Sequence, residues 1–233
     1  MHINKKQINV LFFKSIAVIS MLILMSSFSG CVHKETMSMD TDSEGDNSEI
    51  NIFEQEQNVK NDIESWLFIG LKVRELDSRP GMNEPVILVD GYSIIKKEIE
   101  IQKIYSECLN NATIKENIVS LIREKAIKAE ATRLGVQPPR EKIEAYLEQV
   151  KRSLNEKTIG TETILAYMEG LEITQEEYLS MLEETAYDMY QREELRILLE
   201  SLHKEKDYEE YVNEIVKRAK IEILDADIEK LLR

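Results

Sequence analysis

Apolar residues recur at helical spacing along most of the chain. The most regular stripe runs from 208 to 219 and places Tyr211, Val212 and Ile215 on one face of a helix. Comparable stripes occupy 59–76, 93–109, 114–134, 139–154, 160–170, 174–202 and 225–233. None of them keeps a strict heptad, so the pattern favours helices that cross one another over a coiled coil. We therefore predict a mainly α fold, an orthogonal helical domain.

The predicted helix starts carry residues that suit helix termini. Ser93 and Asp207 are expected N-caps, and Pro139 suits a first helical turn because its missing N–H leaves no donor unpaired. Thr113-x-x-Glu116 and Thr174-x-x-Glu177 are two capping boxes, in which side chain and backbone bond reciprocally.

Two short apolar runs far apart in the sequence favour strands instead. Val86–Val89 precedes an Asp90-Gly91 turn, and Ile221–Leu224 lies near the end of the sequence. We expect these two strands to pair and to close residues 86–233 into one domain.

The N-terminal segment has the features of an export signal. Lys5, Lys6 and Lys14 flank or precede the apolar run Ile16–Met25, which is short for a spanning helix. Ser29-Gly30-Cys31 resembles the bacterial lipobox, although Phe28 stands where leucine is usual. The resemblance implies that residues 1–30 are a lipoprotein signal peptide and that Cys31 carries a lipid. A signal anchor or a chance cysteine are the alternatives.

The next two segments differ in composition. Residues 31–52 are rich in acidic and small polar side chains, and we expect a disordered tether. Residues 53–85 predict an N-terminal extension, a helix over Val59–Leu76 followed by a loop. The sequence leaves open whether this helix packs on the domain.

Charge and residue type exclude several functions. The net charge is −14, and without residues 1–30 it is −17, which disfavours binding to nucleic acid because phosphates require basic patches. The three histidines, His2, His33 and His203, form no cluster in the sequence, so we expect no metal site, no cofactor and no catalytic residue. With Cys31 lipidated, Cys108 would be a single, buried structural thiol.

One set of residues is a candidate binding site. Methionine and tyrosine suit apolar grooves that accept varied sequences, and both occur repeatedly between 167 and 190. The candidate groove comprises Tyr167, Met168, Tyr178, Met181, Met189 and Tyr190. The alternative interpretation is that these side chains pack the core.

The order of parts from 86 to 224 resembles the N-terminal chaperone domain of SurA- and PrsA-type foldases. The matching pieces are Val89–Ser93, Ala129–Val136, Pro138–Ile143, Glu169–Tyr178 and Lys217–Ile223. Pro138 departs from the family, which usually places serine or threonine there. The family often carries a parvulin prolyl isomerase domain, for which this chain has no room, so the expected module lacks isomerase activity.

The resemblance implies a chaperone-like role. We expect a lipid-anchored protein on the extracytoplasmic face of a bacterial membrane, from a Gram-positive organism, that binds unfolded or extended secreted polypeptides. The alternative is a structural or adaptor lipoprotein that holds one folded envelope partner.

Overall fold

The computed structural model describes residues 48–109, 112–158, 160–202 and 207–233. Over these ranges the chain is mainly α-helical with one small antiparallel sheet, which confirms the predicted fold class. In chain order the elements are α3 (Ser48–Leu76), β1 (Pro85–Val89), β2 (Tyr92–Ile95), α4 (Lys96–Leu109), α5 (Ile114–Arg133), α6 (Arg140–Glu156), α7 (Thr161–Leu171), α8 (Gln175–Leu202), α9 (Tyr208–Arg218), β3 (Ile221–Ile223) and α10 (Ala226–Leu232). The signal segment, Cys31 and residues 32–47 lie outside the described residues.

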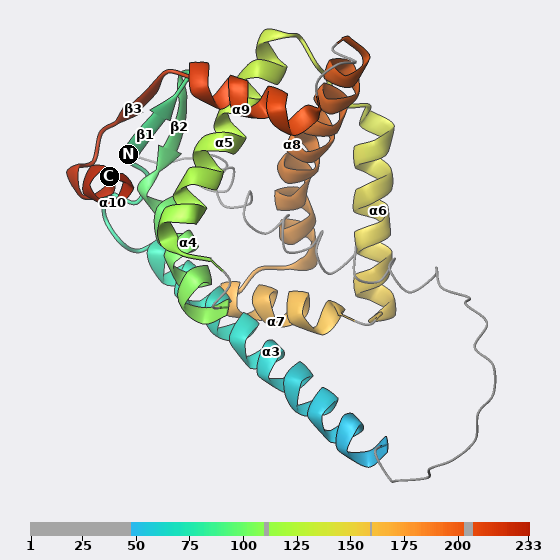
Figure 1. Cartoon of the computed structure of the whole chain (residues 1–233). Coiled ribbons are helices and arrows are strands. Elements are labelled where there is room, and N and C mark those ends of the chain that lie inside the picture. The colour runs from blue at the N-terminus through green and yellow to red at the C-terminus, as the bar shows by residue number, and fades with distance from the viewer. Residues whose placement is uncertain (1–47, 110–111, 159, 203–206) are drawn as a thin grey trace, which may run out of the picture.

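The helices are arranged as the sides of a rectangle. Figure 1 shows α4 and α5 along one side and α6 and α8 along the other. Helices α3 and α7 cross at one end of this rectangle, and α9 crosses at the other end, beside the sheet.

The sheet joins the two remote apolar runs. Strand β1 lies in the middle and pairs antiparallel with both neighbours, in the order β2-β1-β3. Ile87 is opposite Ile223 and Val89 is opposite Ile221, so the predicted pairing is confirmed. Asp90 and Gly91 have φ values of 49° and 86°, as a two-residue hairpin turn with two left-handed residues requires.

Strand β2 was not predicted from the sequence. The expected helix capped by Ser93 was wrong: the chain turns back on β1 with Val89 opposite Tyr92, and α4 begins only at Lys96. The side chain of Glu98 takes over the capping, because its Oε2 accepts a hydrogen bond of 2.8 Å from the N–H of Ile95. The tight turn and the β-branched Ile94 and Ile95 favour a hairpin over a helix at this point.

Three other predicted helix starts are confirmed, whereas Pro139 is the N-cap of α6 and not its first helical residue, which is Arg140. Thr113 and Glu116 form a reciprocal capping box at α5. Thr174 donates its N–H to Glu177 over 2.8 Å and its hydroxyl accepts from the N–H of Glu177 over 3.2 Å, in front of α8. Asp207 caps α9 through the N–H of Glu210.

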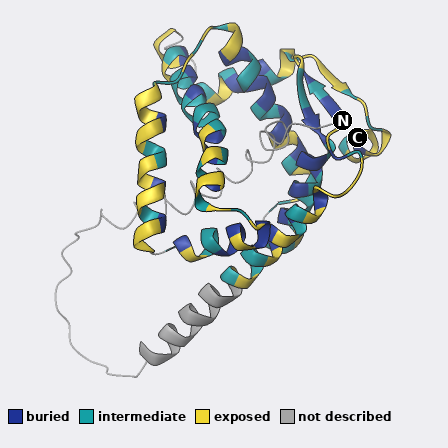
Figure 2. Cartoon of the chain, turned by 180° about the vertical axis from the view of Figure 1, so that it is seen from behind, coloured by how far each residue is buried: buried dark blue, intermediate teal, exposed yellow. Residues whose placement is uncertain are grey.

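Buried apolar side chains form three clusters. The first joins α3, α4, α6, α7 and α8, the second joins the sheet to α4, α5, α9 and α10, and the third joins α5, α8 and α9. Between α4 and α5 a buried ion pair links Glu98 to Lys125 over 2.9 Å, with both side chains at most 5% exposed. Figure 2 shows that buried residues follow the inner sides of these helices.

Helix α3 belongs to this body. Ile69, Val73 and Leu76 are at most 1% exposed and lie in the first cluster. The helix crosses α7 closely at two glycines: a Cβ atom on Gly70 would lie 2.4 Å from the carbonyl oxygen of Tyr167, and one on Gly170 would lie 2.3 Å from that of Leu67. Because α3 begins at Ser48, the last residues of the expected tether are helical.

Candidate functional site

Half of the candidate groove residues are in the core. Tyr167, Met168 and Tyr178 are 2%, 6% and 1% exposed and belong to the first cluster. Their assignment to a groove was therefore wrong, and the alternative interpretation, core packing, holds for these three side chains.

An aromatic group explains their burial. The ring of Trp66, from α3, meets Tyr167 edge-on at 5.9 Å and lies 6.3 Å from Tyr105 of α4. The hydroxyl oxygens of Tyr105 and Tyr167 are 3.4 Å apart. Burial raises the pKa of both tyrosines, so both stay neutral. This group packs α3, α4 and α7 together.

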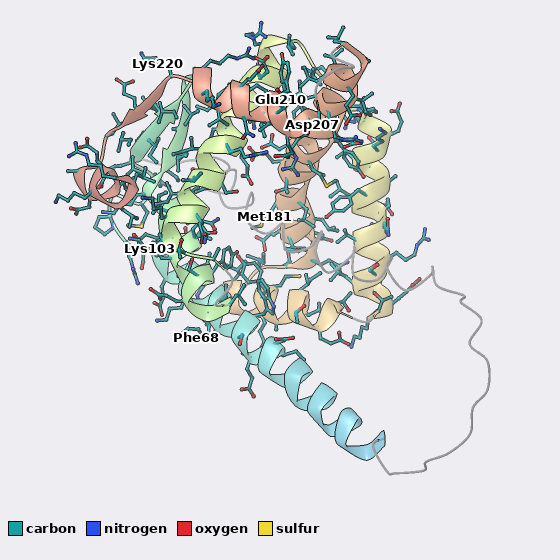
Figure 3. The ribbon with its side chains drawn as sticks, viewed as in Figure 1. Phe68, Lys103, Met181, Asp207, Glu210 and Lys220 are labelled. Carbon is teal, nitrogen blue, oxygen red and sulfur yellow. The ribbon has the colours of Figure 1, made fainter. Side chains whose placement is uncertain are left out.

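Met181, Met189 and Tyr190 are only half-buried along the first two thirds of α8. Met181 packs against the edge of the first cluster, and Figure 3 places it on the side of α8 that faces α4 and α5. Tyr190 meets Tyr146 of α6 edge-on at 6.4 Å. Burial, followed by the nearby Tyr190, raises the pKa of Tyr146 to about 12.

Polar contacts hold the middle of α8 in place. Lys128 of α5 bonds to Asp188 over 2.6 Å, and Lys142 of α6 bonds to Glu194 over 2.7 Å. The side-chain amide of Gln191 donates to the carbonyl oxygen of Val136 over 3.0 Å. These contacts fix the helix backbone from both sides. Neither Met189 nor Tyr190 belongs to the three apolar clusters of the described residues. Tyr190 follows Met181 by nine residues and therefore lies on the opposite side of α8, so the structure does not bring these two candidate groove residues together.

The structure also shows a pocket that was not predicted from the sequence. It has a volume of about 690 Å³ and lies between the β1–β2 turn, the second half of α5 and α9. Its lining consists of Asp90, Tyr92, Ala126, Ala129, Glu130, Thr132, Arg133, Ile215 and Arg218. The hydroxyl of Tyr92 donates to that of Thr132 over 2.9 Å and closes one side.

Glu130 is the buried centre of this pocket. Arg133 donates to its carboxylate twice, over 2.7 and 2.8 Å, and Arg218 donates to it from α9. The hydroxyl of Tyr211 lies 3.5 Å from the same oxygen. These donors, Arg133 first, hold the pKa of Glu130 below its usual range. Arg133 lies in the last turn of α5 and Arg218 in the last turn of α9. Their ion pairs with Glu130 therefore join these two helices.

The described residues contain no candidate metal centre. No group of three or more His, Cys, Asp or Glu side chains could hold a metal there. Cys108 is half-buried, less buried than expected, and burial followed by the charge of Glu107 raises its thiol pKa. His203 lies outside the described residues.

None of the described helices is long and apolar enough to span a bilayer. Comparison with protein-family models, with curated proteins and with solved structures finds no match. The resemblance to the foldase chaperone domain therefore stays a prediction from the residues.

Proposed function

We propose that this chain is a non-enzymatic module that holds unfolded or extended polypeptides at the extracytoplasmic face of a bacterial membrane, anchored by a lipid on Cys31. The observation that carries the proposal is a pair of half-buried methionines, Met181 and Met189, which lie about two turns apart on the same side of α8. These side chains are half-buried on a helix whose backbone is fixed by ion pairs to its neighbours.

The chemistry of these side chains suits weak, sequence-tolerant contacts. Methionine has three rotatable bonds and a polarisable sulfur, so it adjusts to guests of different shape. Tyr190 lies on the opposite side of α8 from Met181 and packs against Tyr146 of α6, so the proposed contact surface is the side that carries the two methionines. A guest would gain affinity by burying its own apolar side chains here, and no covalent step is involved.

The negative net charge of the chain favours guests that carry basic residues. Without residues 1–30 the chain carries 27 basic against 44 acidic side chains. This field attracts basic segments and accelerates their association, an effect that salt screens. Unfolded polypeptides that combine apolar with basic residues are therefore the expected guests.

Suppression of aggregation tests the proposal. The full chain in non-ionic detergent is mixed with several chemically unfolded proteins, and light scattering is followed against detergent alone. We expect the chain to reduce scattering, Met189→Asp to lose most of this effect, and the matched control Met189→Leu to retain it. Circular dichroism checks that both variants are folded.

Two outcomes would refute the proposal: no suppression with any unfolded protein, or equal suppression by wild type and Met189→Asp. One folded partner recovered in equal amounts after cross-linking, without effect on unfolded proteins, would support the adaptor alternative instead.

A further inference from the structure

Strand β3 has an open outer edge. The N–H of Asp90 donates to the carbonyl oxygen of Lys220 over 3.0 Å, and the N–H of Leu224 donates to that of Val86 over 2.8 Å. The main-chain groups of Lys220 and Leu224 therefore face β1. Because these directions alternate along an antiparallel strand, the main-chain groups of Ile221 and Ile223 face outward. No hydrogen bond from another described residue reaches them.

The side chains at this edge are apolar as well. Ile221 is 42% exposed and Ile223 is half-buried, although their partners on β1, Val89 and Ile87, are fully buried. Open edges of this kind are usually protected, since they attract further strands. Figure 1 shows β3 at the margin of the sheet, with α9 at one end and α10 at the other.

We propose that β3 pairs antiparallel with β3 of a second copy of this chain, about a twofold axis at Ile221. The two three-stranded sheets would then become one continuous sheet. Ile221 would exchange both main-chain hydrogen bonds with the partner's Ile221 and bury its side chain there. Ile223 would face the partner's Ala219.

Charge complementarity selects this register. With the twofold axis at Ile221, Lys220 lies directly opposite the partner's Glu222, and the symmetry repeats this pair. Such cross-strand pairs of opposite charge stabilise a sheet. The pairing also ends before α10, which begins at Ala226.

The neighbouring registers lack this match. The outward main-chain groups stay opposite one another only when the pairing shifts by two residues, which moves the twofold axis by one residue. One shift moves the axis to Glu222 and places two carboxylates face to face, which destabilises the pair. The next shift moves the axis to Ile223 and brings the partner's chain toward α10, at the far end of β3 (Figure 1).

Charge reversal tests the pairing. Sedimentation equilibrium of the full chain, in detergent matched to the solvent density, gives the number of chains per particle. We expect a dimer that becomes about tenfold weaker in Lys220→Glu and in Glu222→Lys, because each change turns two attractive pairs into repulsive ones. The double variant Lys220→Glu/Glu222→Lys restores both pairs and should restore the dimer. Glu210→Lys on α9 is the control for one reversed charge elsewhere.

Three results would overturn the proposal: a wild-type monomer at every concentration, no recovery in the double variant, or the same weakening by Glu210→Lys. Hydrogen exchange at the amides of Ile221 and Ile223 that slows only when an unfolded polypeptide is added would assign the edge to that guest, and would also overturn the proposal. The inference is independent of the proposed function, because Met189→Asp should leave the dimer unchanged.

Discussion

Replacing Gly70 by alanine adds one methyl group at the crossing of α3 and α7. In an exposed helix this change would stabilise the folded chain by about 1 kcal/mol, because alanine has the higher helix propensity. Here the new Cβ would lie 2.4 Å from the carbonyl oxygen of Tyr167 and 2.9 Å from the Cα of Gly170. Both atoms belong to the backbone of α7, so no side chain can rotate away and the helices must separate.

The steric effect should exceed the gain in propensity. Overpacking a tight contact typically destabilises by about 1–3 kcal/mol, and contact with rigid backbone places this site at the upper end. Separating the helices also loosens Ile69 and Val73, which are fully buried beside the crossing. After subtraction of about 1 kcal/mol for propensity, we expect Gly70→Ala to lower the free energy of unfolding by about 2 kcal/mol.

Urea unfolding measures this change. Trp66 is the only tryptophan of the chain and lies one turn before Gly70, against Tyr105 and Tyr167, so its fluorescence reports the packing of α3. With an ordinary urea dependence of about 2 kcal/mol per molar, the midpoint should fall by about 1 M.

A matched control separates packing from propensity. Glu64 is exposed on the same helix, and Glu64→Gly should destabilise only by the helix propensity of glycine, less than Gly70→Ala does. Gly170→Ala should resemble Gly70→Ala, since its Cβ would lie 2.3 Å from the carbonyl oxygen of Leu67. An unchanged or higher midpoint for Gly70→Ala would refute the close crossing of α3 and α7.

Two further substitutions test the buried charges by the same unfolding measurement. Glu130→Gln should lower the free energy of unfolding by about 1 kcal/mol at neutral pH, because its guanidinium partners remain largely hydrated. Since the pKa of Glu130 is lowered on folding, its contribution is present above about pH 4.3 and lost as the pH falls toward the folded pKa, so wild type and variant should converge in acid. Glu144→Gln, in an exposed pair, is the control, and equal behaviour of the two variants would contradict this account. Lys125→Met leaves Glu98 buried without its charged partner and should lower the free energy of unfolding by about 3 kcal/mol. Lys115→Met, at an exposed position, is the control and should change it little. An unchanged free energy of unfolding in Lys125→Met would show that the pair is not buried.

Local signals explain which parts of the fold the sequence could predict. A capping box needs only four neighbouring residues, so Thr113 and Thr174 marked the starts of α5 and α8 without knowledge of the tertiary structure. The pairing of β1 with β3 was also predictable, because two short apolar runs outside the helical stripes had no other obvious partner.

Ambiguous and long-range signals explain what was missed. Ile94 and Ile95 fit either a helix face or a strand, and periodicity alone does not separate the two over so few residues. In the sequence Gly70 weakens a helix, whereas in the fold it permits contact with Gly170, a hundred residues away. The carboxylate of Glu130 likewise meets Arg218 only after α9 has packed on α5.

The same limit applies to the candidate site. Periodicity places Tyr178, Met181 and Met189 on one broad apolar arc of α8, but it does not show which part of the arc a neighbouring helix covers. The first turns of α8 pack in the core with α3 and α7, which buries Tyr178. Between this core and the third cluster, which α8 joins through Leu195 and Leu199, ion pairs at Asp188 and Glu194 flank the helix and Met189 is half-buried.

Methyl NMR of the protein, labelled only at its methionines, tests the central claim most directly. When an unfolded polypeptide is added, we predict that the methyl signals of Met189 and Met181 shift or broaden, while that of buried Met168 stays unchanged. An unchanged Met189 signal at saturating polypeptide would contradict the assignment of the binding face to α8.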